Sequence, residues 1–244
     1  MKIIYALIII LAVYSIGTFI RLRYTLSVAN LPNIVQQDKT FANQQSASDG
    51  NKTLRYIAAG DSTAAGEGAS SVQKTYTYRV DEFLSQRNTV EYRNVGVRGA
   101  QTQDILDDQL EKIIAFNPDV ITLSVGANDV THLKSSNKVV TNFKTIIETL
   151  QAKTSAQIYI TDVPILDQVT LLPYPYKKYL GHQIKKINPQ ILLLENERVH
   201  IIDIYNFGWN TYPDVNITFA KDGFHPSDEG YNNWTNAFLS RIQD

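Results

Sequence analysis

Ser62 is the first residue of the chain whose type and position could do chemistry. It stands in segment 59–64, which reads AGDSTA and directly follows the apolar, strand-like run 54–59. A serine hydroxyl is a weak nucleophile at pH 7 unless a base lies within hydrogen-bond reach and donors face the developing oxyanion. The rest of the chain must therefore supply a base and several donors.

The candidate base is His225, in segment 222–226, which reads DGFHP. An imidazole can take the proton of a serine and later return it to a leaving alcohol. Asp222 lies three residues earlier, so in a turn its carboxylate would accept a hydrogen bond from Nδ1 of His225 and fix the tautomer. The alternative is that Asp222 only caps the last helix. We predict a triad of Ser62, His225 and Asp222.

The chain also offers donors for an oxyanion hole. We predict that the backbone N–H groups of Ser62 and Gly96 and the side-chain amide of Asn128 converge on the substrate oxygen. Glycine allows close approach of the backbone, and asparagine is a donor that needs no protonation. Three polar neighbours are expected to support these groups through hydrogen bonds, namely Asp61, Asn94 and Asp129.

These residues lie in four short segments, each at or just past the end of an expected strand or opening the last helix: 60–62, 94–96, 126–129 and 222–226. In this order the segments resemble the blocks of the SGNH (GDSL-type) hydrolase family, in its esterase and lysophospholipase-like branch. The resemblance covers about residues 54–242 and implies a flavodoxin-like fold and hydrolysis of an oxygen ester. The serine motif lacks the last glycine of Gly-x-Ser-x-Gly, which separates the chain from the α/β-hydrolases.

Apolar runs of strand length alternate with amphipathic stretches from residue 54 onward. Short, continuously apolar strands are typical of a parallel sheet with both faces covered. We predict an α/β protein, a three-layer α/β/α sandwich with a mostly parallel sheet of about five strands, preceded by an N-terminal hydrophobic helix. The expected strands are 54–59, 90–95, 120–125, 157–161 and 200–205, and the expected helices are 78–87, 102–116, 139–153, one within 176–197, and 228–242.

The N-terminal region differs from the rest of the chain. Residues 3–20 are uncharged and mostly apolar, and as a helix they would reach about 27 Å, near the thickness of the hydrocarbon core. We predict that residues 1–24 are a transmembrane anchor; the alternatives are a cleaved signal segment and a buried core helix. Residues 25–53 are predicted to be a polar linker, and residues 54–244 the hydrolase domain.

Composition excludes several other functions. The formal net charge of −1 gives no field that would attract a polyanion, so no nucleic-acid partner is expected. The absence of cysteine excludes disulfides and thiolate metal sites, and neither a metal nor another cofactor is expected. The glycine-bearing turn 66–68 lacks a following Gly-Lys-Ser/Thr and is not a phosphate loop. The remaining histidines are expected to pack against neighbouring residues or to lie at the surface: His132, His182 and His200. The lysine cluster is expected to be a solvated helix face: Lys177, Lys178, Lys185 and Lys186.

The site predicts the reaction class but leaves the substrate open. We predict a carboxylesterase or lysophospholipase-like enzyme; the alternatives are a carbohydrate O-deacetylase acting on cell-envelope glycans and a catalytically silent binding module. The long apolar and aromatic segment 163–176 is expected to line an acyl pocket or form a lid, or else to be a packed surface loop. The enzyme is expected to be anchored to a membrane with its catalytic domain outside the cytoplasm, or to be secreted after signal cleavage.

Overall fold

The computed structural model describes residues 2–28, 39–41, 53–169, 172, 174–211 and 215–242. These residues form a six-stranded sheet in the order β1-β3-β2-β4-β5-β6. Five neighbouring strands are parallel, which confirms the predicted sheet, and their order is that of flavodoxin-like proteins. The strands are β1 (Lys39–Phe41), β2 (Leu54–Gly60), β3 (Val90–Asn94), β4 (Val120–Ser124), β5 (Gln157–Thr161) and β6 (Val199–Ile202).

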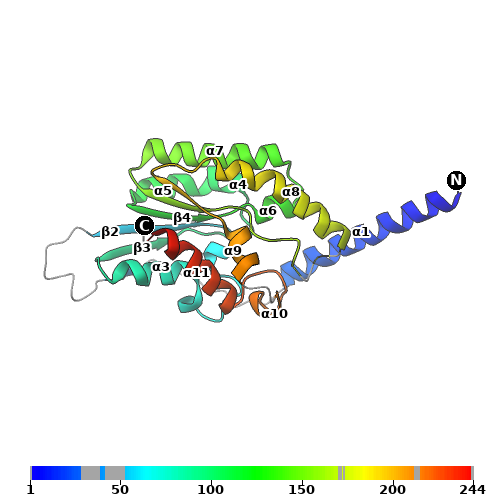
Figure 1. The fold of residues 1–244 in the computed structure, drawn as a ribbon, viewed down its shortest axis with the longest axis horizontal. Coiled ribbons are helices and arrows are strands. Elements are labelled where there is room, and N and C mark those ends of the chain that lie inside the picture. Colours follow the sequence, from blue (N-terminus) through cyan, green and yellow to red (C-terminus); the bar gives the residue numbers. More distant parts are fainter. Residues whose placement is uncertain are drawn as a thin grey trace.

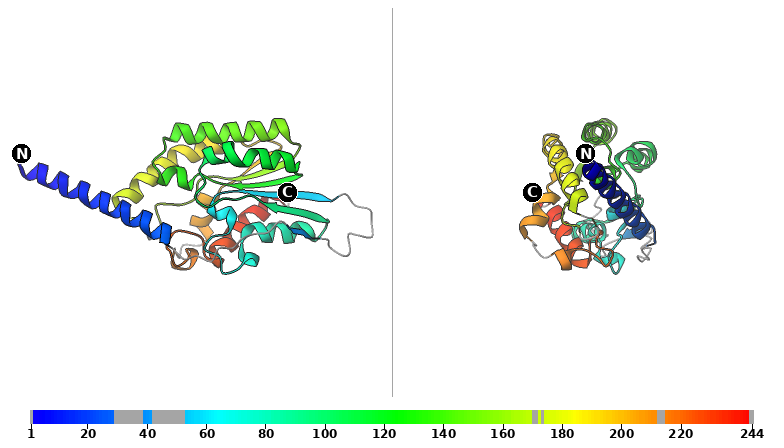
Figure 2. Two further views of the ribbon diagram at one scale, coloured as in Figure 1. Left: turned by 180° about the vertical axis from the view of Figure 1, so that it is seen from behind. Right: turned by 90° about the vertical axis from the view of Figure 1, so that its right-hand side faces the viewer.

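Helices cover both faces of this sheet, as the three-layer prediction requires. Figures 1 and 2 show α5, α7 and α8 on one face and α3 and α11 on the other. The helices are α1 (Lys2–Val28), α2 (Ser62–Ala65), α3 (Tyr76–Ser85), α4 (Thr102–Asp104), α5 (Leu110–Phe116), α6 (Ala127–Thr131), α7 (Ser136–Lys153), α8 (Tyr174–Leu192), α9 (Ile204–Thr211), α10 (Val215–Thr218) and α11 (Asp228–Ile242), with a 3-10 turn, η2 (Val72–Lys74), and a π turn, η3 (Ile105–Gln109).

The core has two parts, one on each face of the sheet. Successive side chains of a strand point to opposite faces, so Ile57 packs with α5, α7 and α8, whereas Tyr56 packs with α3 and α11. On the second face the rings of Tyr76 and Phe238 stack with their centroids 4.7 Å apart. Both faces of the sheet are therefore covered by apolar side chains.

The sixth strand lies within residues 25–53, which were predicted to be a polar linker. Lys39–Phe41 forms β1, which pairs antiparallel with β3 along Val90 to Tyr92. Without β1, strand β3 would be an edge with unpaired N–H and C=O groups, and a short added strand satisfies part of that edge. The rest of the predicted linker, apart from residues 25–28 at the end of α1 and Thr53, lies outside the described residues.

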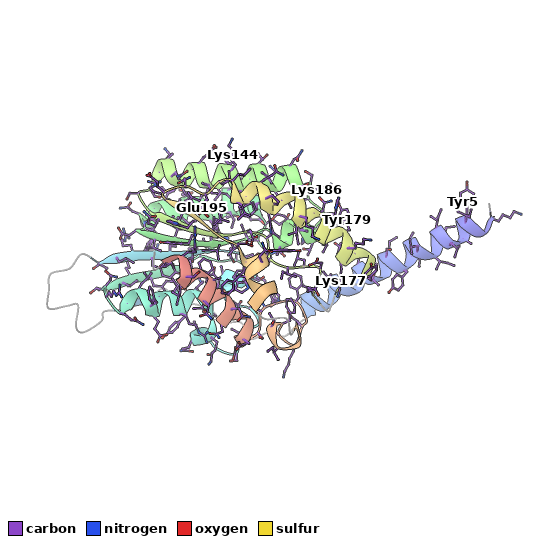
Figure 3. All side chains as sticks on the ribbon, viewed as in Figure 1. Tyr5, Lys144, Lys177, Tyr179, Lys186 and Glu195 are labelled. Carbon is purple, nitrogen blue, oxygen red and sulfur yellow. The ribbon has the colours of Figure 1, made fainter. Side chains whose placement is uncertain are left out.

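The predicted N-terminal helix is present as α1, which extends away from the sandwich (Figures 1 and 2). The labelled Tyr5 lies near its free end in Figure 3. Nearer the domain, the ring of Phe19 meets that of Tyr176 of α8 edge to face, at 6.3 Å between centroids. Among the residues described by the structure, no helix is long and apolar enough to cross a membrane, so the predicted anchor is not supported.

The segment after β5 is more deeply packed than a lid would be. Val163, Leu166, Val169 and Leu172 are all buried in the core on the α7 and α8 side. Tyr174, by contrast, is 74% exposed. These four aliphatic side chains already have partners in the core, which favours the packed-loop alternative over an acyl pocket along this segment.

Candidate active site

Ser62 lies at the carboxyl edge of the sheet, where β2 ends and the short helix α2 begins. Asp61 caps α2, because its carboxylate accepts a hydrogen bond of 2.9 Å from the backbone N–H of Thr63. Burial raises the pKa of Asp61 to about 6, although the bonds from Thr63 and the nearby His225 oppose the shift. Ser62 is the first residue of α2, so its N–H points out of the helix without an intrahelical acceptor.

A buried glutamine fixes the turn that carries Ser62. The side-chain amide of Gln109 accepts a hydrogen bond from the N–H of Gly60 at 2.9 Å and donates one to its carbonyl at 2.8 Å. Gln109 ends the π turn η3, in a region where the sequence predicted one continuous helix. A π turn shifts the side-chain register of a helix, and here it accompanies the approach of Gln109 to the serine turn.

The structure brings the three predicted triad residues together. Nε2 of His225 lies 2.9 Å from Oγ of Ser62, and Nδ1 lies 2.5 Å from Oδ2 of Asp222. The other carboxylate oxygen of Asp222 accepts the backbone N–H groups of Phe224 and His225, at 3.0 and 3.1 Å. Asp222 therefore holds both the ring and the backbone of the turn that presents His225.

The charge state of Asp222 suits this role. Burial alone would raise its pKa, but the hydrogen bond and charge of His225 and the two backbone N–H groups outweigh burial, so the pKa is lowered. Asp222 is then ionised at neutral pH and accepts the Nδ1–H of the imidazole. This tautomer leaves a lone pair on Nε2, directed at Ser62.

The predicted role of Gly96 needs correction. Its N–H donates a 2.8 Å hydrogen bond to Oδ1 of Asn94 and so is already engaged. A Cβ at Gly96 would lie 2.9 Å from Cβ of Ala64 and from N of Ala65, which explains the glycine by close packing against α2. Gly96 fits the site as a packing residue rather than as an oxyanion donor.

A second glycine in the same loop, Gly99, was not predicted as a site residue and has different surroundings. Gly99 has φ of +77°, and a Cβ there would meet no described atom within 4 Å. The next carbonyl, that of Ala100, accepts a 3.1 Å hydrogen bond from Nδ2 of Asn128. An amide NH2 has two donors, so Asn128 keeps one for a substrate beside this loop. Gly99 could have been identified in the sequence from its place in the turn Gly99-Ala100, just before α4.

The predicted supporting residues tie these loops to the rest of the fold. Nδ2 of Asn94 donates to the carbonyl of Ala64 at 2.8 Å, which joins the end of β3 to α2. Asp129 accepts the N–H and the hydroxyl of Thr102, at 2.9 and 2.6 Å. Burial raises the pKa of Asp129, and the bonds from Thr102 oppose that shift. Together with Asp61, these side chains fix the loops that carry Ser62, Gly99 and Asn128.

One charged residue of the site was missed altogether. Glu67 stands in the glycine turn after α2, with its side chain 9% exposed, and its Oε2 lies 3.3 Å from Nε2 of His225. Its Oε1 pairs with Nε of Arg98 at 2.9 Å. Burial raises the pKa of Glu67, and the charges of His225 and Arg98 oppose the shift. No sequence pattern indicated this contact, because it depends on how two distant turns pack.

The other histidines lie outside the triad. Nδ1 of His132 contacts the carbonyl of Asn128 at 2.7 Å, His200 stacks on Tyr159, and His182 is exposed. Within the described ranges, no group of three or more His, Asp or Glu side chains could hold a metal ion. The predicted lysine cluster lies on α8, where Figure 3 labels Lys177 and Lys186.

A parallel sheet that carries serine, histidine and aspartate within hydrogen-bond distance at its carboxyl edge has the arrangement of a hydrolase. The model of the GDSL-like Lipase/Acylhydrolase family matches residues 58–232. The chain therefore belongs to this family and is an ester hydrolase. No curated protein is significantly similar to it in sequence.

Solved structures share the fold at low sequence identity. The lipase Lip_vut3 from a goat rumen metagenome is 22% identical, with 77% of this chain and 97% of that chain covered and a TM-score of 0.62. A member of the lipolytic protein G-D-S-L family from Veillonella parvula is 20% identical, with 78% and 99% covered and a TM-score of 0.64. The acetylxylan esterase Axe2 from Geobacillus stearothermophilus is 17% identical, with 78% and 94% covered and a TM-score of 0.56.

Proposed function

We propose that the protein is a serine carboxylesterase that works through a covalent acyl-enzyme. The observation that carries this proposal is the continuous hydrogen-bonded line from Oγ of Ser62 through the ring of His225 to the carboxylate of Asp222. In the first step the O–H bond of Ser62 breaks, its proton moves to Nε2, and Oγ bonds to the ester carbonyl carbon. The ester oxygen becomes an oxyanion.

Collapse of this intermediate breaks the bond to the alcohol, which leaves with the proton from Nε2. A water molecule then gives a proton to Nε2 and attacks the acyl carbon, and His225 returns that proton to Oγ as the acid is released. For the oxyanion we propose the N–H groups of Ser62 and Gly99 and the amide of Asn128 as donors. Gly99 replaces Gly96 in this set, since the N–H of Gly96 is bonded to Asn94.

We expect short acyl esters to be better substrates than long ones. The apolar segment after β5, which was expected to line an acyl pocket, has four of its side chains buried in the core. Comparing p-nitrophenyl acetate with p-nitrophenyl octanoate tests this point. We expect a higher kcat/KM for the acetate, and a clear preference for the octanoate would support a lysophospholipase-like activity instead.

A carbohydrate O-deacetylase is the second candidate, because it too removes a short acyl group and an acetylxylan esterase shares the fold. Acetate release from an acetylated polysaccharide, compared with fatty-acid release from a lysophospholipid, separates these two activities. A silent binding module would release neither product and would not react with a fluorophosphonate.

We further propose that residues 54–244 form the catalytic domain and act outside the cytoplasm, either tethered by or cleaved from the hydrophobic segment 1–24. The support is a hydrophobic N-terminal stretch followed by a polar one. Protease treatment of intact cells should digest the domain if it is exposed on the cell surface, and N-terminal sequencing of the mature protein would show whether residues 1–24 are removed. A tethered domain protected in intact cells and digested only after lysis would contradict this location.

A further inference from the structure

The catalytic histidine is faced by two carboxylates. Asp222 bonds Nδ1 of His225, and Glu67 places Oε2 3.3 Å from Nε2, the nitrogen that also contacts Ser62. The contact with Glu67 has the distance of an ion pair but not the alignment of a hydrogen bond, and Oε2 has no hydrogen-bond partner among the described residues. Every other polar contact of Glu67 serves to hold it in this place.

The position of Glu67 is fixed by its backbone and by its second oxygen. Its N–H donates to the carbonyl of Ser62 at 2.9 Å, and its carbonyl accepts the hydroxyl of Tyr231 at 2.7 Å. Oε1 is held by Arg98 at 2.9 Å. The neighbouring Gly68 packs so closely on the His225 turn that a Cβ would lie 2.4 Å from the carbonyl oxygen of Pro226. Oε2 is thus presented to the imidazole by a rigid turn.

In the resting enzyme Oε2 faces no donor. The proton of the neutral imidazole lies on Nδ1, toward Asp222, and Nε2 presents its lone pair to the hydroxyl of Ser62. A buried oxygen without a donor destabilises the folded state, because it has lost its hydrogen bonds to water. The folded enzyme therefore carries an unfavourable contact beside its catalytic base.

Proton transfer removes this disadvantage. When the Ser62 proton moves to Nε2, the ring becomes an imidazolium and Oε2 faces a positive charge. An interaction that is unfavourable before the transfer and favourable after it lowers the barrier, since only interactions stronger in the transition state accelerate a reaction. We propose that Glu67 is a positioning residue that promotes proton transfer to His225. Glu67 itself gains and loses no proton. This inference rests on the proposed serine esterase function.

The competing explanation is that Glu67 and Arg98 form an ion pair that only stabilises the loops. Glu67→Gln and Arg98→Gln both break that pair, but only the first removes the charge that faces His225. With p-nitrophenyl acetate we expect Glu67→Gln to lower kcat about tenfold, which equals about 1.4 kcal/mol, with little change in KM. Arg98→Gln keeps the Glu67 carboxylate, which the backbone of the turn still holds, and should lower kcat less than Glu67→Gln does. Melting temperatures show whether each variant is folded.

A kcat loss in Glu67→Gln at least threefold larger than in Arg98→Gln supports the proposal. A smaller difference overturns it, because breaking the pair would then explain the effect. If Glu67→Gln fails to fold, the variant carrying both substitutions, which leaves no unpaired charge, is compared with Arg98→Gln by the same threefold criterion. A folded wild-type enzyme that hydrolyses no ester would instead refute the proposed function, independently of Glu67.

Discussion

Nε2 of His225 lies 2.9 Å from Oγ of Ser62, although the two residues are 163 positions apart in the sequence. Ser62 follows a central strand, and His225 stands in the turn that leads into α11, which packs on α3 beside that strand. The parallel sheet therefore assembles the reacting pair from opposite ends of the domain.

Asp222→Asn should lower kcat for p-nitrophenyl acetate by about a thousandfold or more. An amide can present its NH2 group to Nδ1, which favours the imidazole tautomer that has its proton on Nε2 and cannot accept one from Ser62. Its Oδ1 can still accept the two backbone N–H groups, so the fold should persist. Steady-state kinetics with a circular dichroism spectrum test this. A loss of less than tenfold in a folded variant would show that Asp222 mainly caps the turn.

Asn128→Ala should lower kcat about 100- to 1,000-fold without unfolding the protein, as expected when one oxyanion donor is removed. Among the residues that the structure describes, this side chain donates only to the carbonyl of Ala100, so its loss should cost little stability. Pre-steady-state measurement of the acylation rate isolates the step concerned. Acylation at the wild-type rate would exclude Asn128 from the oxyanion hole.

Asp61→Asn should make the protein more stable at pH 8 but change its stability little at pH 4. In the folded protein the pKa of Asp61 is raised from 3.8 to about 6, so the folded state binds this proton more tightly than the unfolded state. The contribution of Asp61 to stability is thus complete below about pH 4 and is lost as the pH rises through 6. The loss is at most about 3 kcal/mol. Asparagine also caps helices, which preserves the bond to Thr63.

Urea denaturation of wild type and Asp61→Asn at pH 4 and pH 8 checks this pH dependence. The free energy of unfolding of the variant, relative to wild type, should be larger at pH 8. If the variant and wild type differ in unfolding free energy by the same amount at both pH values, burial does not disfavour the ionised form of Asp61.

Tyr231→Phe should destabilise the fold by about 1–2 kcal/mol and reduce activity modestly. The buried hydroxyl of Tyr231 donates toward the carbonyls of Thr63 and Glu67, at 3.2 and 2.7 Å, and so links α11 to the serine turn. Its removal leaves a buried carbonyl without a donor. Thermal melting measures the first effect, and an unchanged melting temperature would mean that other contacts hold this turn.

The sheet and the triad could be predicted because each has a local signal. Continuous apolar runs predicted the parallel strands, and β5 has the expected bounds, 157–161. Residues 200–205 were also expected to form a strand, but β6 ends at Ile202 and α9 begins at Ile204. Apolar character alone does not separate a buried strand from a helix, and here Asp203 stops the strand by accepting the N–H of Asn206.

The remaining parts of the site depend on contacts with no local signal. Gln109 reaches Gly60 across 49 positions, through a π turn that the helical pattern did not indicate. Glu67 contacts His225 only because two turns pack against each other. Residues 94 to 99 contain two glycines, and the tertiary contacts of Gly96 with Asn94 and α2 separate this packing glycine from the candidate donor Gly99.

Ser62 is the residue that we expect to form the covalent intermediate. Wild-type protein and Ser62→Ala are treated with a fluorophosphonate, digested, and analysed by peptide mass spectrometry. We expect one adduct, on the peptide that contains Ser62, and none in the variant. An adduct on another residue, or a folded wild-type protein that hydrolyses p-nitrophenyl acetate with no adduct at Ser62, would contradict the account.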